Sequence, residues 1–77
     1  MENFKKFAYK LGKRITKIRL IKNISLEVLA LDTKIDITTL EEIEAGSENS
    51  YLDEIVTISQ GLNVEMSDLF SDKPFTF

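Results

Sequence analysis

A chain of 77 residues is long enough for one small domain, and this one contains no cysteine and no histidine. Disulfides and thiolate metal sites are therefore excluded, together with the commonest general base and the commonest metal ligand. The net charge of −3 hides a strong division: residues 1–22 hold eight of the ten basic residues and one acid, whereas residues 23–77 hold the other two and twelve acids. This asymmetry indicates either a charged partner or a solvated basic helix beside an acidic body.

The sequence contains no candidate membrane span and no secretory signal pattern. Its apolar runs stay well below the ~18 residues that a spanning helix needs. The first residues lack a continuous apolar stretch and a small-residue cleavage pattern. We therefore expect a cytoplasmic protein without a membrane partner.

The first predicted helix covers residues 4–21. Its apolar residues recur at helical spacing and fill one face; they are Phe4, Phe7, Ala8, Leu11, Ile15 and Ile18. Another face carries a stripe of lysines about 60° wide, made of Lys6, Lys10, Lys13 and Lys17. This stripe is either a solvated face or a binding surface. Asn23 ends the pattern, because asparagine tolerates the left-handed backbone that stops a helix.

Two short helices with good capping residues follow. Ser25 is a favourable N-cap for a helix over residues 25–33, and Asp36 for a helix over residues 36–45 that ends at Gly46. The connection between these two helices is very short. Helices joined this closely cross at a large angle, which is the helix-turn-helix arrangement.

A fourth and a fifth helix complete the expected all-α domain. Ser50 and Asp53 form a capping-box pattern at the start of the fourth helix, Gly61 and Asn63 predict its end, and residues 64–70 suggest a short fifth. No segment alternates with period two, so no strand is expected. The expected core contains Leu11, Ile15, Ile18, Leu29, Ala30, Leu40, Ile43, Leu52, Ile55, Ile58, Leu62 and Leu69.

Several segments between residues 11 and 70 form one gapless pattern. They are Leu-Gly-Lys-Arg-Ile (11–15), Ile-Arg (18–19), Ile-Ser-Leu-Glu (24–27), Leu-Ala (29–30), Ile-Glu-Ala-Gly (43–46), Gly-Leu-Asn-Val (61–64) and Ser-Asp-Leu-Phe (67–70). With them the chain resembles the phage-repressor and Cro type of helix-turn-helix DNA-binding proteins, the Xre-like transcriptional regulators. The resemblance implies a compact, lambda-repressor-like fold of five helices in a cytoplasmic regulator that often binds DNA as a dimer. We expect a single domain over residues 1–77, with a helix-turn-helix core (11–70), an N-terminal extension of the first helix (1–10) and an irregular tail (71–77).

The resemblance also implies an ion pair between Arg19 and Glu44. In this family an arginine near the end of the first helix pairs with a glutamate near the end of the third. The helical wheel agrees, because Arg19 lies beside the apolar face rather than within the lysine stripe.

The same resemblance assigns base contacts to the third helix, which the family places in the major groove of double-stranded DNA. The exposed positions of that helix are Ile37, Thr38, Glu41 and Glu42. Thr and Ile suit contact with a thymine methyl group, and Glu can accept a hydrogen bond from cytosine N4. Acidic side chains repel phosphates, however, so this surface departs from the basic surface that DNA binding usually needs.

The expected phosphate contacts are also weakened. Leu26 stands where the family typically has a glutamine that reaches a phosphate, and the loop containing Ser47 and Asn49 lacks the family's basic residues. The helix that begins after Ser25 still offers backbone amides for one phosphate. Lys34 in the turn is the nearest cation.

Two functions stay open from the sequence. The resemblance favours a DNA-binding transcriptional regulator, while the acidic third helix favours a protein-interaction module that meets a protein partner or a second copy through charge. An enzyme is not expected, since adjacent carboxylates such as Glu41 and Glu42 point about 100° apart on a helix and do not converge on one atom. No cofactor and no metal are expected either.

Overall fold

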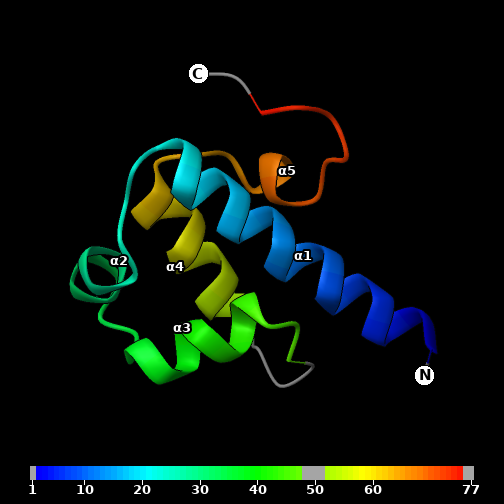
Figure 1. The fold of residues 1–77 in the computed structure, drawn as a ribbon, viewed down its shortest axis with the longest axis horizontal. Coiled ribbons are helices and arrows are strands. Elements are labelled where there is room, and N and C mark those ends of the chain that lie inside the picture. Colours follow the sequence, from blue (N-terminus) through cyan, green and yellow to red (C-terminus); the bar gives the residue numbers. More distant parts are fainter. Residues whose placement is uncertain (1, 48–51, 76–77) are drawn as a thin grey trace.

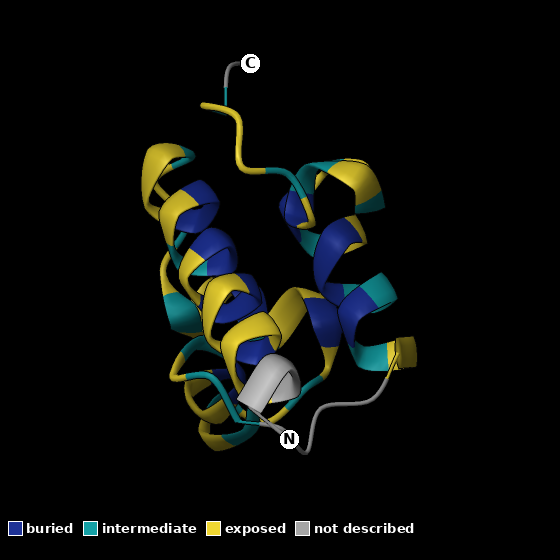
Figure 2. Ribbon diagram, turned by 90° about the vertical axis from the view of Figure 1, so that its right-hand side faces the viewer, coloured by how far each residue is buried: buried dark blue, intermediate teal, exposed yellow. Residues whose placement is uncertain are grey.

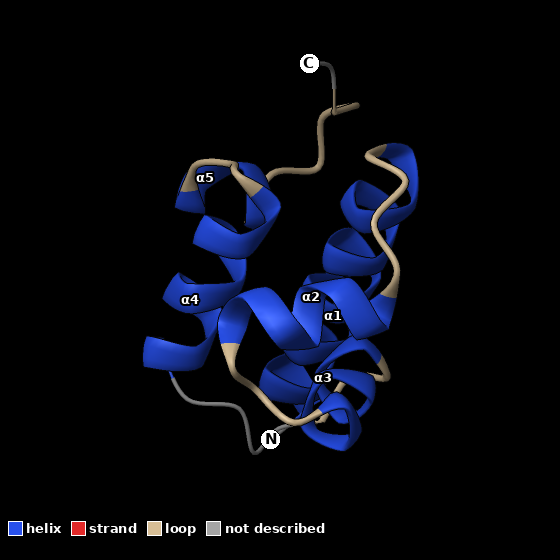
Figure 3. Ribbon diagram, turned by 90° about the vertical axis from the view of Figure 1, so that its left-hand side faces the viewer, coloured by secondary structure: helices blue, strands red, loops and turns tan. Residues whose placement is uncertain are grey.

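Five helices form the protein in the computed structural model, which describes residues 2–47 and 52–75, with side chains from residue 5 onward (Figure 1). Their bounds are α1 (Glu2–Ile21), α2 (Leu26–Thr33), α3 (Ile37–Glu44), α4 (Leu52–Leu62) and α5 (Met66–Leu69). The described residues contain no strand, and loops join the helices (Figure 3). The expected all-α, five-helix fold is therefore confirmed. None of these helices is both long and apolar enough to cross a bilayer within the described part of the chain.

Left-handed residues end three of the helices. Asn23 (φ 63°) follows α1, Lys34 (φ 59°) follows α2 and Asn63 (φ 58°) follows α4. After α1, the Ile24 N–H donates to Arg19 O over 3.0 Å, which satisfies a carbonyl at the helix end. Asn23 and Asn63 were expected as helix stops on these grounds, whereas a lysine in this conformation is less common than glycine or asparagine.

The core lies between the five helices, and each of them contributes to it. Dark-blue buried faces of the helices point toward one another in Figure 2. The buried cluster consists of Leu11, Ile15, Ile18, Leu29, Leu40, Ile43, Ile55, Ile58, Leu62 and Leu69. Ala30 is only half-buried against it. Leu52 was wrongly expected in the core: it is 71% exposed, because it stands in the first turn of α4, before that helix reaches the cluster.

Two glycines allow helices to approach closely. A Cβ at Gly12 would lie 2.6 Å from Glu44 O, so the bare backbone of α1 is what lets it pack on the end of α3. Gly61 was expected to end the fourth helix, but it lies inside α4 instead. A Cβ there would lie 2.7 Å from Thr33 Cγ2, so this glycine serves the contact between α2 and α4.

Arg14 fastens the chain beyond α5 to α1. Its guanidinium is buried and donates to Asp68 O and to Lys73 O, each over 2.6 Å. The Phe75 ring lies 6.0 Å from Arg14 Cζ and packs against the core. Residues 71–75 are irregular, as expected, and contact α1 through Arg14.

Candidate nucleic-acid interface

The α2 and α3 helices and the turn between them form a helix-turn-helix unit. At its start Ser25 Oγ accepts a hydrogen bond from the Val28 N–H over 3.1 Å, so Ser25 caps α2 as expected. In the turn, the Lys34 N–H donates to Ala30 O over 2.8 Å. The expected side-chain cap of α3 is absent, because Asp36 makes no capping hydrogen bond. The turn is therefore held by backbone bonds and by Thr33, whose Oγ1 donates to Leu29 O over 2.7 Å.

One face of α3 is turned to solvent. Thr38, Glu41 and Glu42 are exposed, and Ile37 is half-buried. The opposite face is buried through Leu40 and Ile43. The core contact thus fixes the rotation of α3 about its own axis and leaves a row of two carboxylates and one hydroxyl free to meet a partner.

Glu44 belongs to the interior and not to this acidic row. Its Oε2 lies 2.8 Å from Arg19 Nε and its Oε1 lies 3.1 Å from Arg19 Nη2, with the two side chains only 11% and 10% exposed. Arg19 Nη1 also donates to Ile24 O over 3.0 Å, and Thr16 Oγ1 lies 2.8 Å from Glu44 Oε1. The ion pair therefore joins the end of α1, the end of α3 and the loop before α2, which fixes α3 relative to the rest of the domain.

The residues expected near phosphates lie in different surroundings. Leu26 is half-buried against the core and does not project as a phosphate-seeking side chain would. The Ser25 hydroxyl is already used in capping. Ser47 is half-buried, and its N–H donates to Glu42 O over 2.9 Å. Lys34 is exposed at the turn, and Asn49 lies outside the described residues, as does Ser50 of the expected capping box.

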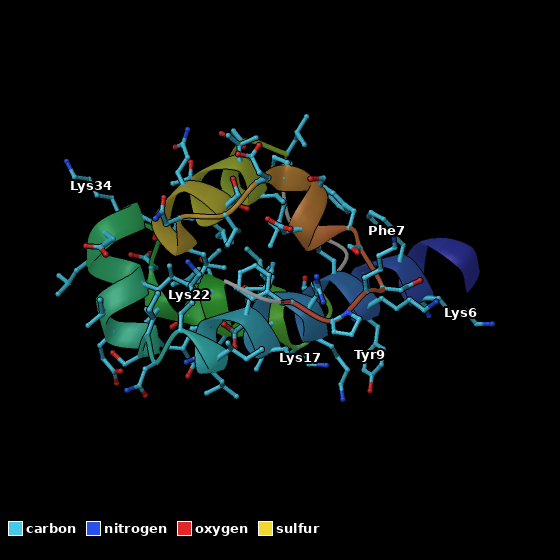
Figure 4. All side chains as sticks on the ribbon, turned by 90° about the horizontal axis from the view of Figure 1, so that it is seen from above. Lys6, Phe7, Tyr9, Lys17, Lys22 and Lys34 are labelled. Atoms are coloured by element: carbon cyan, nitrogen blue, oxygen red, sulfur yellow. The ribbon has the colours of Figure 1, made fainter. Side chains whose placement is uncertain are left out.

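The charge of this surface is mainly negative. Five exposed acids lie on α2, the turn and α3, namely Glu27, Asp32, Asp36, Glu41 and Glu42. Lys34 is the only basic residue between positions 23 and 72. In Figure 4 it extends from the α2 end of the molecule, far from Lys17 and Lys6 on α1. No group of three or more potential metal ligands occurs in the described part of the chain.

Two apolar residues on the outer face of α2 were missed by the sequence analysis. Val28 is 47% exposed and Leu31 is 79% exposed. The sequence does indicate exposed apolar residues here, since α2 holds more apolar residues than one face of an eight-residue helix can bury. Leu31 also lines an open hollow with Ile35 and Ile37, so the helix-turn-helix surface combines apolar contacts with acidic side chains.

Known proteins share this sequence pattern and this architecture. The profile of the Cro/C1-type helix-turn-helix DNA-binding domain matches residues 14–74. The control protein C.BamHI of Bacillus amyloliquefaciens is 41% identical over 59 residues, which cover 75% of this chain and 73% of that protein. The crystal structure of the restriction-modification controller protein C.AhdI of Aeromonas hydrophila superposes with a TM-score of 0.78 at 30% identity, covering 82% of this chain and 96% of that one.

Proposed function

The chain belongs to the Cro/C1-type helix-turn-helix family of DNA-binding transcriptional regulators, and from this premise we propose that it is a controller protein for a restriction-modification system. Similarity to C.BamHI and C.AhdI, both named as controllers, is the observation that carries this proposal. Such a regulator acts on double-stranded DNA beside the genes it controls, in the cytoplasm.

We assign base reading to the exposed row on α3. With α3 in the major groove, Glu42 and Glu41 would accept hydrogen bonds from cytosine N4, and the Thr38 methyl group and Ile37 would contact thymine methyl groups. A carboxylate in the groove is selective because it repels the acceptors of guanine. This row therefore favours specificity over general affinity.

We propose that the backbone N–H groups at the start of α2 and the Lys34 side chain make the phosphate contacts that position the protein on DNA. The first N–H groups of a helix have no partner within the helix, so they can donate to one phosphate oxygen. We include Ser25, Leu26 and Ser47 in this contact region as neighbours of the phosphate path, and propose Asn49, which lies outside the described residues, as a further contact. With one lysine available, the affinity of a single copy for its site is low.

A homodimer compensates for weak contacts by reading two half-sites. Two-fold related recognition helices meet successive major grooves about 34 Å apart. We therefore expect a palindromic operator and a dimer in solution. Sedimentation or light scattering measures the oligomeric state directly.

Selection from a random duplex library at low salt tests the function. We expect the parent to enrich one palindromic sequence. The Glu42→Gln variant is expected to lose discrimination for cytosine at one position of each half-site, by about 1–3 kcal/mol for a good contact, while binding unrelated DNA slightly better because a repelling charge is gone. Asp53→Asn, which removes one exposed acid from α4, is the matched control and should keep the parental preference.

The acidic row also supports a second candidate, a protein-interaction module derived from the same fold. That candidate predicts no shift of any duplex at low salt. A parent that binds duplex DNA without enriching a sequence, or a Glu42→Gln variant with parental base preference, would contradict the assignment of α3 as the reading element.

A further inference from the structure

A row of lysines on α1 is not used by the function proposed above. Lys6, Lys10, Lys13 and Lys17 are all exposed and are here called the lysine face. In Figure 4 the Lys6 and Lys17 side chains extend outward from α1, away from the other helices. The lysine face is thus the most concentrated positive charge of a chain whose net charge is −3.

The lysine face keeps its charge largely uncompensated. From residue 5 onward, no carboxylate of the described residues forms an ion pair with any of the four lysines. Lys13 Nζ lies 5.3 Å from the centre of the Tyr9 ring. This contact does not neutralise the positive charge of Lys13. Lys10, Lys13 and Lys17 line an open hollow with Asp72, the one acid beside them.

This face points away from the recognition helix. Gly12 and Thr16 mark the side of α1 that touches α3, through the close backbone approach and the contact with Glu44. At about 100° per residue, the lysine face lies roughly 110° around α1 from that side. The lysine face is therefore on a different side of α1 from the one that packs on α3, and attraction through solvent is screened over about 10 Å at ordinary salt.

The lysine face crosses the start of the segment that matches the family profile. The family profile begins at residue 14, after Lys6, Lys10 and Lys13. These lysines stand on the part of α1 that continues beyond the helix-turn-helix unit.

The chemistry of the face suits a phosphate backbone better than a protein surface. Its lysines follow one another over about 16 Å of helix, a straight row of point charges without an arginine fork. Lysine is depleted in protein interfaces, whose energy comes mainly from aromatic residues and arginine. A duplex is a uniform linear polyanion with one charge per ~3.4 Å along each strand, which such a row can follow without a fixed register.

We propose that the lysine face is a second DNA-binding surface, which binds the phosphate backbone of another duplex segment without sequence preference. The proposal rests on the proposed function in one respect: duplex DNA is the polyanion that the chain already meets. One copy then binds two stretches of DNA, one of specific sequence on α3 and one of any sequence on α1.

The test compares two double variants that remove the same charge. Lys10→Gln with Lys17→Gln neutralises two of the four lysines of the lysine face, and Lys5→Gln with Lys73→Gln neutralises two exposed lysines outside it. Binding to random-sequence duplex is measured by fluorescence anisotropy across a salt titration. The slope of log affinity against log salt should fall by about 1.8 for the first variant, at ~0.9 per lost phosphate contact, and should keep the parental value for the second.

A bridging assay gives the second readout. An immobilised duplex carrying bound protein should capture a labelled duplex of unrelated sequence. The Lys10/Lys17 variant should remain on the immobilised operator and lose this capture, whereas the Lys5/Lys73 variant should keep both. Equal slopes and equal capture for the two variants would overturn the proposal, and this outcome is also the one expected if the face binds an acidic protein.

Failure of this proposal is distinguishable from failure of the proposed function. A parent that enriches an operator, with a Lys10/Lys17 variant of parental slope, refutes the lysine face alone. A parent that enriches no sequence, with a slope that depends on Lys10 and Lys17, refutes operator reading alone. A parent that binds no duplex refutes both.

Discussion

Replacing Arg19 with alanine removes both side-chain hydrogen bonds from Arg19 to Glu44 and leaves that carboxylate, 10% exposed, with the Thr16 hydroxyl as its neighbour. Removing one partner of a buried ion pair costs about 3–5 kcal/mol, since the remaining charge stays desolvated. The Ile24 carbonyl loses its donor as well. At about 0.05–0.15 kcal/mol per residue, a chain of this size is stable by only about 4–12 kcal/mol, so the change removes about a quarter or more of the total.

Urea unfolding followed by circular dichroism measures this loss. Lys13→Ala is the control, because Lys13 is exposed on the same helix and should change the free energy of unfolding by no more than about 0.5 kcal/mol. Glu44→Gln removes the negative charge of the pair and should also destabilise the folded protein strongly, since it leaves the Arg19 charge without its counter-charge. Equal unfolding midpoints for Arg19→Ala and Lys13→Ala would refute the account of a buried, structurally important pair.

Two further predictions concern the buried core and the close approach of α1 to α3, and both are measured by the same unfolding experiment. Leu29→Ala should cost about 2–5 kcal/mol through lost burial and a cavity, whereas Leu52→Ala, at a residue 71% exposed, should stay within about 0.5 kcal/mol; similar losses at both positions would contradict the burial pattern. Gly12→Ala should cost about 1–3 kcal/mol or more, because its Cβ would meet the carbonyl oxygens of Ile43 and Glu44 and push α1 from α3. A Gly12→Ala protein with parental stability would show that the two helices do not need this contact.

The helices of this protein could be predicted because their signals are local. Helical spacing of apolar residues gave α1 and the later helices, and Asn23 and Asn63 stop their helices in the left-handed conformation expected of them. The Ser25 cap also depends only on residues three positions apart. Such features require no knowledge of how the helices pack.

The errors concern contacts between distant parts of the chain. Leu52 has the spacing of a core residue, but its exposure depends on where α4 begins to cross the core. Gly61 was taken for a helix stop because its partner surface on α2 is remote in sequence. The sequence analysis gave Arg14 no role of its own, since nothing in its neighbours reveals acceptors 54 and 59 residues away.

In the candidate interface, too, some features could be predicted from the sequence, whereas those that depend on packing could not. The family resemblance assigned Ile37, Thr38, Glu41 and Glu42 to the exposed side of the third helix; the structure leaves the last three exposed, whereas Ile37 is half-buried. The surroundings of Leu26 depend on packing against the core, which the sequence does not state. Base preference is a property of the complex with DNA, so the selection experiment decides it.

The way in which Arg14 holds the last residues has a consequence for how this protein can diverge. Its guanidinium grips main-chain oxygens, and every residue type supplies one. Substitutions at Lys73 therefore leave its anchoring oxygen in place, so the exposed side chain can change without loss of this contact. The Asp68 carboxylate, in contrast, also accepts a hydrogen bond from the Glu65 N–H over 3.0 Å and caps α5. Attachment of this segment to α1 therefore depends on the Arg14 side chain more than on the side chains of the segment itself.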